Sequence, residues 1–481
     1  MEISKENIYK YLNSNMRKKL NRDKYTISTI AAKKLITNER VDIFIKYLYA
    51  LSIINEDNNT FLESLYCEHI KAFNHFVEAD STGKVGKESF VSNFKNIIES
   101  IKRNGFDSNY CIPVSENLIP LDGAHRIAAA AALNLDVTVV NLELKDEKYN
   151  IDFFRSRGLN ESLLDYITTQ FAFFLPNSYM VLVWPRANAK DEEIRNILNR
   201  NGTIINRKNI RLSYNGLVNF QRIVYKREKW LGNYSNDFEG VHTKASQCYS
   251  TNGILRAFLF QSNADLIKMK DEIRVLYKVG KHAVHINDTH EETVEISQLV
   301  FNENANHFIN CSVRKEQKVF NRLFEEYLHC IEQKKIDCKS VALIGGIIPL
   351  YGIRDAKDLD YISTKQIPES FNDNIELETK KLKYSSYSVQ EIINNPKLHF
   401  VFKGVKFASL NVILEIKEKR NNDSDKRDVL YIRKLLKDGE IKYSLADYIK
   451  ILLSISFYRR NIKIFLLKIR YYIYVILNKI K

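Results

Sequence analysis

The chain has 481 residues, of which 45% are hydrophobic and 27% charged, a balance typical of folded domains rather than of disordered or collagen-like chains. The formal net charge of +15 favours an anionic partner: a nucleotide, a nucleic acid or an acidic membrane surface. The six cysteines include no CxxC pair, which argues against a zinc site and predicts reduced thiols in the cytoplasm. The sequence has no apolar signal region and no apolar stretch of about 18 residues, so we expect neither a signal peptide nor a spanning helix.

We expect a multidomain α/β and α+β chain. Residues 1–75 are predicted to be a helical extension, because apolar residues recur at helical spacing in RVDIFIKYLYALSIINE and FLESLYCEHIKAF. Residues 76–165 are predicted to contain a helix that ends at Gly105, the strand CIPVS, an Ala-rich helix and the strand DVTVVNLEL. Strands and helices alternate again in two further predicted domains, 170–312 and 313–440.

A turn that leads into the Ala-rich helix carries the motif DGAHR. A helix N-terminus presents free N–H groups to an anion, and arginine is a planar partner for phosphate. The segment LDGAHRIAAAAAL resembles the ParB/sulfiredoxin superfamily, whose G-x-x-R-x-x-A turn holds nucleotide phosphates. The resemblance implies nucleotide binding by Gly123, His125 and Arg126. It also implies that Glu78 is the base that kinase members use. A structural pairing of His125 and Arg126 with Asp122 is the alternative.

In the next domain, the segment GKHAVHINDTHEETVEISQLV places His285 before Asp288 and Thr289, which we expect to cap a helix. This segment resembles the active-site strand and following helix of nucleoside diphosphate kinases. Upstream, MVLVWPRANAKDEEIRNILNRNGTIINRKNIRLS resembles the first strand, helix and second strand of that family. The resemblance implies a ferredoxin-like domain at residues 170–312, in which His285 is the phosphorylated residue.

The same resemblance implies that Tyr225 and Arg274 contact the nucleotide and that Glu291 orients the imidazole of His285. One departure from the family is Trp184, which stands where the family has its catalytic lysine before a proline. A domain with lost or altered activity and a working kinase therefore both stay open.

The segment SVALIGGIIPLYGIRDAKDLDYI combines an apolar strand, the pair Gly345 and Gly346, and two aspartates, Asp358 and Asp360. Residues i and i+2 of a strand share one face, so the two carboxylates lie side by side. Adjacent carboxylates repel each other unless a cation lies between them, and hard oxygen ligands suit Mg²⁺ shared with substrate phosphates. The glycines allow backbone N–H groups to approach a triphosphate.

This pattern resembles the nucleotidyltransferase superfamily that includes DNA polymerase β and the antibiotic adenylyltransferases, whose signature is hG(G/S) followed by DhD. The resemblance implies a nucleotidyltransferase fold at residues 313–440, with Asp358 and Asp360 as catalytic residues and Mg²⁺ ligands. ATP or CTP would be the substrate, held by the glycine pair and by Arg354, with Lys357 adding charge.

Two later features bear on this resemblance. The family usually has a third carboxylate on a later strand, and KGVKFAS offers none at the expected place. A two-carboxylate active site, a site that binds a nucleotide without turnover, and a DLD that only caps a strand therefore all stay open. Further on, a charged D-x-x-D turn is expected at Asp425 and Asp428.

The C-terminal segment 441–481 is predicted to form basic amphipathic helices. From Tyr448 onward it has no acidic residue and eight basic ones. These are Lys450, Arg459, Arg460, Lys463, Lys468, Arg470, Lys479 and Lys481. Such a segment is suited to an anionic membrane surface on the cytoplasmic side, and docking on the protein's own core is the alternative. Because it holds more than half of the net charge, the rest of the chain does not favour a nucleic-acid partner.

Together these features predict an enzyme of the cytoplasm, peripheral on the inner face of the membrane. It would be an Mg²⁺-dependent nucleotidyl or phosphoryl transferase that acts on a small phosphorylated or hydroxylated acceptor. The arrangement resembles bacterial surface-polysaccharide biosynthesis proteins, which make or use nucleotide-activated precursors. Two alternatives are a ParB-like, CTP-dependent switch on DNA and a scaffold of degenerate nucleotide-binding domains.

Overall fold

The computed structural model describes residues 2–9, 12, 14–57, 59–78, 83–251, 253–367, 370–378 and 380–438. The predicted basic segment 441–481 lies outside these residues. The described chain divides into two compact units. The first contains the residues up to Pro176 together with Thr203–Asn206 and Leu259–Gln261, and the second contains the rest.

The first unit is built on a four-stranded sheet in the order β1-β2-β4-β3. Its strands are β1 (Glu2–Ser4), β2 (Lys24–Ala31), β3 (Ile112–Val114) and β4 (Asp136–Asn141). β2 pairs antiparallel with β4 over residues 26–31, and β3 pairs parallel with β4. The prediction that residues 1–75 are helical is therefore wrong over β1 and β2. The β2 sequence KYTISTIA is rich in β-branched residues, and β2 completes the sheet to which β3 and β4 belong.

The helices of the first unit are α1 (Lys5–Tyr9), α2 (Ser14–Lys19), η1 (Ala32–Leu35), α3 (Val41–Ile54), α4 (Thr60–Asn74), α5 (Lys87–Asn104), α6 (Ala124–Ala132), α7 (Ile151–Ser156) and α8 (Glu161–Phe174). Among them, α7 and α8 were not predicted from the sequence. Asparagine side chains at 59, 150 and 160 accept N–H groups at the starts of α4, α7 and α8. As predicted, α5 ends at Gly105, whose N–H bonds the Ile101 carbonyl.

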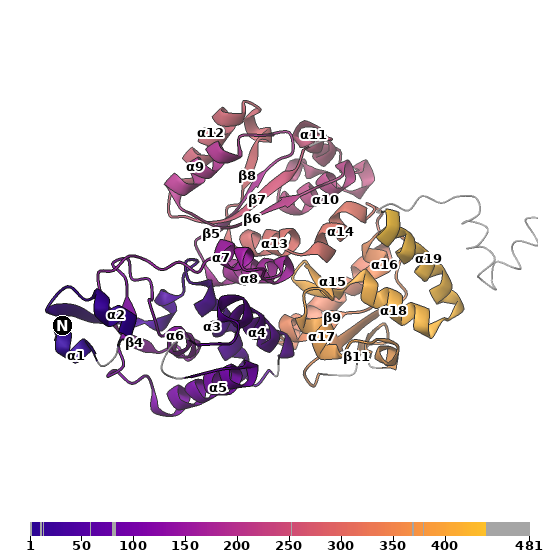
Figure 1. Cartoon of the computed structure of the whole chain (residues 1–481). Coiled ribbons are helices and arrows are strands. Elements are labelled where there is room, and N and C mark those ends of the chain that lie inside the picture. Colours follow the sequence, from indigo (N-terminus) through magenta and orange to yellow (C-terminus); the bar gives the residue numbers. More distant parts are fainter. Residues whose placement is uncertain are drawn as a thin grey trace, which may run out of the picture. The chain divides into compact units, whose positions relative to one another are not determined.

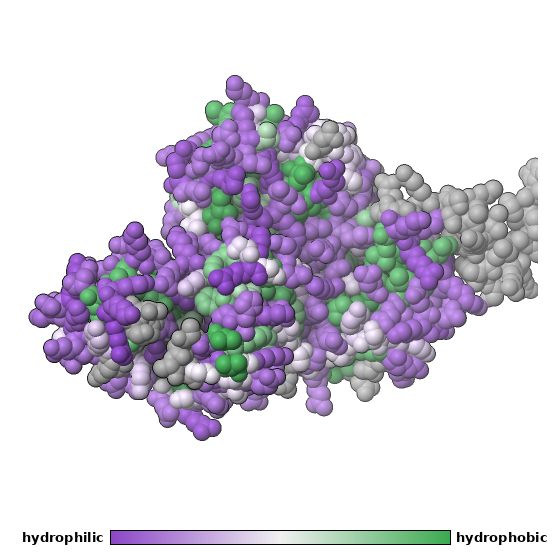
Figure 2. Space-filling model, viewed as in Figure 1, coloured by the Kyte–Doolittle hydropathy of each residue, from purple (hydrophilic) through white to green (hydrophobic). Residues whose placement is uncertain are grey.

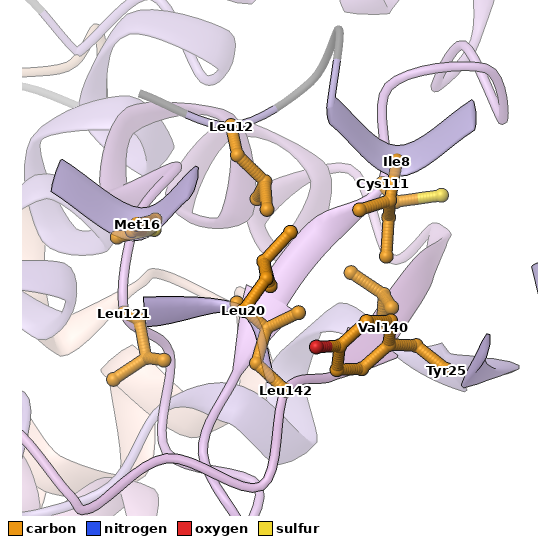
Figure 3. Close-up of a cluster of buried hydrophobic side chains, with 9 residues drawn as sticks. All are labelled: Ile8, Leu12, Met16, Leu20, Tyr25, Cys111, Leu121, Val140 and Leu142. Atoms are coloured by element: carbon orange, nitrogen blue, oxygen red, sulfur yellow. The ribbon is translucent and has the colours of Figure 1, made fainter. Parts of the chain in front are cut away.

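A cluster of buried side chains fixes the N-terminal segment on this sheet (Figure 3). It consists of Ile8, Leu12, Met16, Leu20, Tyr25, Cys111, Leu121, Val140 and Leu142. Residues from the first 25 positions and from β4 lie in the same apolar layer, so hydrophobic burial holds together segments more than a hundred residues apart.

A second four-stranded sheet has the order β6-β7-β5-β8, and most of its residues belong to the second unit. Its strands are β5 (Ser178–Val183), β6 (Thr203–Ile210), β7 (Leu255–Gln261) and β8 (Val284–Ile286). The helices that follow them in the chain are α9 (Asp191–Asn201), α10 (Tyr214–Val224), η2 (Lys229–Leu231), η3 (Tyr234–Asn236), α11 (Glu239–Cys248), α12 (Leu266–Tyr277), η4 (Gly280–His282), α13 (His290–Val300) and α14 (Glu303–Cys311). Thr289 caps α13 as predicted, in a reciprocal capping box with Glu292.

A six-stranded mixed sheet follows, in the order β11-β12-β10-β9-β14-β13. Its strands are β9 (Val341–Leu343), β10 (Leu359–Ser363), β11 (Ser370–Asn372), β12 (Ile375–Leu377), β13 (His399–Phe402) and β14 (Val405–Ala408). The helices are α15 (Lys318–Gln333), η5 (Cys338–Ser340), α16 (Ile347–Leu350), η6 (Lys380–Tyr384), α17 (Val389–Asn394), α18 (Leu410–Arg420) and α19 (Asp423–Asp438). Figure 1 shows α18 and α19 next to each other, in the yellow range of the colour bar, and they pack together.

The described chain is thus a mixed α/β protein with several sheets and more than one domain, as predicted. Hydrophilic residues dominate the face shown in Figure 2, with smaller hydrophobic areas between them. Among the described residues, none of the helices has both the length and the apolar character needed to span a bilayer.

Candidate functional sites

The end of β9 and the start of β10 form one wall of a pocket of about 340 Å³. The four residues of the predicted motif line it: Gly345, Gly346, Asp358 and Asp360. Six cationic side chains line it as well: Arg354, Lys357, Lys381, Lys417, Arg420 and Arg427. The volume is within the range of small-molecule sites, and the excess of positive over negative side chains suits a polyphosphate.

Gly345 is required by the close approach of the two strands. A Cβ atom at this position would lie 2.5 Å from the backbone nitrogen of Asp360. The N–H groups of Ile344 and Gly345 both donate to the Asp360 carbonyl, at 3.0 and 2.9 Å. The Gly345 N–H is therefore used inside the sheet and is not free for a phosphate, contrary to the sequence-based expectation. Its role is to bring Asp360 against the glycine turn.

Asp360 is nearly buried on β10, and its carboxylate forms an ion pair with the ammonium of Lys381 at 2.5 Å. Burial raises the pKa of Asp360 above its ordinary value, more than the nearby ammonium group lowers it. A carboxylate whose ionised form is penalised in this way is stabilised by additional positive charge in the pocket.

Asp358 precedes β10 and is exposed on the pocket wall. Within the described residues, no side chain forms a hydrogen bond or ion pair with its carboxylate. Asp358 and Asp360 are close enough that the charge of Asp358 raises the pKa of Asp360. This donor set fits Mg²⁺, which takes one or two carboxylates and completes its shell with water and phosphate oxygens. Three or more His, Cys, Asp or Glu do not come together as a metal cage in the described part of the chain.

A third carboxylate, missed in the sequence, lies beside this pair. β12 runs parallel to β10 with Asp360 opposite Glu376, so Glu378, two residues further, faces the same side. Glu378 accepts from the ammonium of Lys381 at 3.2 Å and from its backbone N–H at 3.0 Å. The segment KGVKFAS, where the resemblance places the third carboxylate, contains β14, but β14 pairs with β9 rather than with β10. KGVKFAS itself offers no carboxylate, and the additional carboxylate near Asp360 comes instead from Glu378, directly after β12.

The opposite wall of the pocket comes from α18 and α19, and its cations are fixed by two fully buried aspartates. Asp428 binds Arg354 through a bidentate pair of 3.0 and 2.6 Å and pairs with Lys417 at 3.0 Å. Asp425 binds Lys417 and Arg420, at 3.2 and 2.6 Å. Both aspartates lie in the first turns of α19, not in a turn between elements as predicted.

Burial opposes ionisation of Asp428, but the hydrogen bond and charge of Arg354 together with Lys417 outweigh it. They hold the pKa of Asp428 below its ordinary value. The hydrogen bonds that Arg354 donates to Asp428 correspondingly raise the pKa of Arg354. The network therefore favours the ionised form of Asp428 and presents three cations, Arg354, Lys417 and Arg420, to the pocket in fixed positions.

A second pocket, of about 650 Å³, lies at the end of β8. It brings together the three residues predicted for the middle domain, His285, Tyr225 and Arg274. The rings of Tyr225 and His285 are in edge-on contact with centroids 5.0 Å apart. Further cations line the pocket: Lys244, Lys270 and Lys281. These three lysines were not predicted from the sequence, because they come from three different elements.

Burial lowers the pKa of His285 to about 3, so its imidazole is neutral at physiological pH. The predicted orienting group, Glu291, is highly exposed and pairs with Arg227 at 3.5 Å, so the structure does not support its predicted role. Trp184 is fully buried, with its ring centroid 6.5 Å from that of His285. It packs beneath the histidine and supplies no charge where the kinase family has a lysine.

In the first unit, the guanidinium group of Arg126 lies close to Gly123, but the residues of the DGAHR motif do not line one common cavity. Arg126 lines a cavity of about 600 Å³ between α5 and the start of α6. Its guanidinium group donates to the Tyr110 carbonyl at 3.4 Å. Gly123 caps α6 in the left-handed conformation, with φ +79°, and is not part of the cavity lining in the described structure.

His125 turns into the packing of the first unit. Its Nε2 lies 3.0 Å from the Tyr66 hydroxyl, and its ring packs edge-on against Phe94. Burial lowers the pKa of His125 well below its ordinary value, so it brings no positive charge to an anion. Glu78 forms an ion pair with Lys84 at 2.8 Å. Neither residue reaches the Arg126 cavity, which contradicts their predicted roles in a nucleotide site there.

Comparison of the chain with protein-family models, with curated proteins and with solved structures gives no match.

Proposed function

We propose that the pocket at Asp358 and Asp360 is the active site of a nucleotidyltransferase that uses ATP or CTP. The observation that supports this most is the convergence of the glycine turn, the two aspartates and six cations on one pocket. The aspartates and the glycine turn come from adjacent strands, whereas Lys417 and Arg420 come from α18. A pocket that combines paired carboxylates with fixed cations suits a metal–triphosphate complex better than it suits a metal ion alone or an anion alone.

In the proposed reaction, a hydroxyl or phosphate oxygen of a small acceptor forms a bond to the α-phosphorus of the nucleotide. The bond from that phosphorus to pyrophosphate breaks, and where the acceptor is a hydroxyl its proton is released to water. Arg354, Lys417 and Arg420 are held by buried aspartates, so they bind the phosphates without reorganisation during the reaction. Lys357 is exposed at the pocket and adds charge to the leaving pyrophosphate.

Asp358 and Asp360 would hold Mg²⁺, which, when bound, neutralises charge on the phosphates and polarises them for attack. The buried position of Asp360 fixes the distance of this charge from the glycine turn, because both strands hydrogen-bond across it. The acceptor we propose is a small hydroxylated or phosphorylated metabolite, and a role in surface-polysaccharide synthesis stays a prediction.

Calorimetric titration of ATP and CTP, with and without Mg²⁺, tests this proposal. The variants are the double change Asp358→Ala/Asp360→Ala and a control, Asp373→Asn, which alters an exposed aspartate in the turn between β11 and β12. In Mg²⁺ we expect the double variant to bind the nucleotide about 100-fold more weakly or worse, and the control to bind normally.

Without Mg²⁺ the double variant should bind at least as well as the wild type, because two negative charges that face the phosphates are gone. Transfer of label from the α-phosphate to an acceptor pool should follow Mg²⁺-dependent binding. Equal nucleotide affinity of the wild type and the double variant in Mg²⁺ would refute the proposal.

We propose, as a second candidate function, phosphoryl transfer at His285. Two observations favour it: His285, Tyr225 and Arg274 share one cation-rich pocket, and the imidazole is neutral and therefore nucleophilic. The strand order β6-β7-β5-β8, with helices between β5 and β6 and between β7 and β8, supports a ferredoxin-like domain. The buried Trp184 favours altered rather than ordinary kinase activity.

Incubation with ATP labelled on the γ-phosphate tests this second function. Acid-labile, alkali-stable label should appear on the wild type and disappear in His285→Gln. The control His329→Gln replaces an exposed histidine on α15 and should keep the label. Label that persists in His285→Gln, or fails to appear on the wild type, would exclude it.

A further inference from the structure

Lys381 occupies a defined place between Asp360, which lines the first pocket, and the neighbouring carboxylate of Glu378. Its Nζ atom lies 2.5 Å from Asp360 Oδ2 and 3.2 Å from Glu378 Oε2. Its backbone N–H donates to the other oxygen of Glu378, so the residue is tethered at both ends. Only 27% of its side chain is exposed, and it lines the pocket directly.

The strand arrangement explains why a cation is needed at this point. β10 and β12 are neighbouring parallel strands, and their register brings Asp360 and Glu378 to the same side. Two carboxylates brought together in this way repel each other unless a positive charge separates them. In the structure, the ammonium of Lys381 supplies that charge.

A divalent ion and the ammonium group compete for the same oxygen. A metal ion binds a carboxylate oxygen at about 2.1 Å and needs a free lone pair on it. Asp360 Oδ2 already accepts from Lys381, whereas Asp358 has no such partner among the described residues. Two-metal transferases hold their ions about 4 Å apart between shared carboxylates, and here the shared position next to Glu378 is filled by the lysine.

We propose that Lys381 is a built-in cation that takes the place of one metal ion, so that the pocket holds a single divalent ion at Asp358 and Asp360. This inference rests on the proposed nucleotidyltransferase function. Lys381 then contributes a fixed positive charge and a hydrogen-bond donor on the Glu378 side of the pocket. The site therefore needs fewer divalent ions to balance its carboxylates than a site with three unpaired carboxylates would need.

The test counts bound ions rather than turnover. Electron paramagnetic resonance of Mn²⁺ is recorded on the full chain saturated with a non-hydrolysable ATP or CTP analogue. Lys381→Met removes the charge but keeps the side-chain length, Lys381→Arg keeps the charge, and the neighbouring exposed Lys380→Met is the matched control.

We expect one Mn²⁺ per chain, with the spectrum of an isolated ion, for the wild type, Lys380→Met and Lys381→Arg. Lys381→Met should hold two ions whose spectra show mutual coupling. One ion in Lys381→Met, or two in the wild type, would overturn the inference alone. A wild type that holds no Mn²⁺ would overturn the proposed function as well. If Lys381→Met does not fold, as judged by its melting temperature, Lys381→Gln replaces it with the same expectation.

Discussion

Replacement of Gly345 by alanine would place a methyl carbon 2.5 Å from the Asp360 nitrogen and 3.3 Å from its Cα. Both atoms belong to the backbone of Asp360, so no flexible side chain can move aside. β9 and β10 would have to separate by roughly 1 Å to restore ordinary contact. The two hydrogen bonds to the Asp360 carbonyl, of 3.0 and 2.9 Å, would then break or weaken.

We estimate the cost as about 2 kcal/mol for overpacking and about 1 kcal/mol for each hydrogen bond. The resulting loss of about 4 kcal/mol corresponds to a fall in melting temperature of roughly 10 °C for a unit of this size. Displacement of the Asp360 carboxylate by about 1 Å should also lower nucleotidyl transfer about 100-fold. Thermal unfolding and label transfer from the α-phosphate measure the two effects.

Gly404→Ala is the control for this prediction. Gly404 has φ +77°, and no atom lies within 4 Å of its added Cβ, so only the backbone penalty of about 1 kcal/mol applies. It lies in the turn between β13 and β14, away from the pocket lining. We expect slightly lower stability and unchanged nucleotide affinity. A Gly345→Ala variant that melts within about 2 °C of the wild type and transfers normally would refute the close-approach argument.

Three further predictions concern stability. Asp428→Ala should lose about 3 kcal/mol at pH 7, because it removes the carboxylate partner of Arg354 and one of the two carboxylate partners of Lys417. The folded pKa of Asp428 is depressed, so this contribution should be present above about pH 4 and vanish as the pH falls through the folded pKa, as urea unfolding at several pH values would show. Leu20→Ala, in the cluster of Figure 3, should lose roughly 3 kcal/mol in chemical unfolding, against less than about 0.5 for the exposed Val85→Ala. His285 is neutral in the fold with a pKa near 3, so the wild type should lose stability as the pH falls below about 6.5, and His285→Gln should lose less.

The sequence predicted the first pocket well where the chemistry is local. Only eleven residues separate the glycine pair from Asp358, and the pairing of β9 with β10, on either side of this segment, brings the two parts of the motif together. Glu378 could not be found in this way. Its strand, β12, has three residues and no recognisable alternation, and its position next to β10 is decided by the order of the whole sheet.

In the first unit, two predictions from the sequence failed, each for a different reason. β2 could have been recognised from KYTISTIA, in which β-branched residues are frequent, but the helical periodicity of the flanking segments dominated the prediction. The direction of His125 could not be predicted from its motif. Its partners Tyr66 and Phe94 lie 59 and 31 residues earlier in the chain, and the packing of α4 and α5 decides where the ring goes.

The buried aspartates of the first pocket bear on the choice between an enzyme and a scaffold of degenerate domains. Asp425 and Asp428 are fully buried, and removing a charge from water costs several kcal/mol that its partners only partly return. Apolar residues of similar volume would stabilise the junction of α18 and α19 at least as well. What the charged network adds is a set of cations held in place along the pocket wall, which favours a functional role.

This reasoning predicts the behaviour of Arg354→Met/Asp428→Leu, which replaces one ion pair by apolar side chains of similar size. Lys417 keeps its second partner, Asp425, so no buried charge is left alone. We expect the free energy of unfolding to stay within about 1 kcal/mol of the wild type. Affinity for ATP or CTP in Mg²⁺ should fall about tenfold, because a fixed phosphate donor is lost. Equal nucleotide affinity in calorimetry, with equal stability, would show that the network serves packing alone and would favour the scaffold.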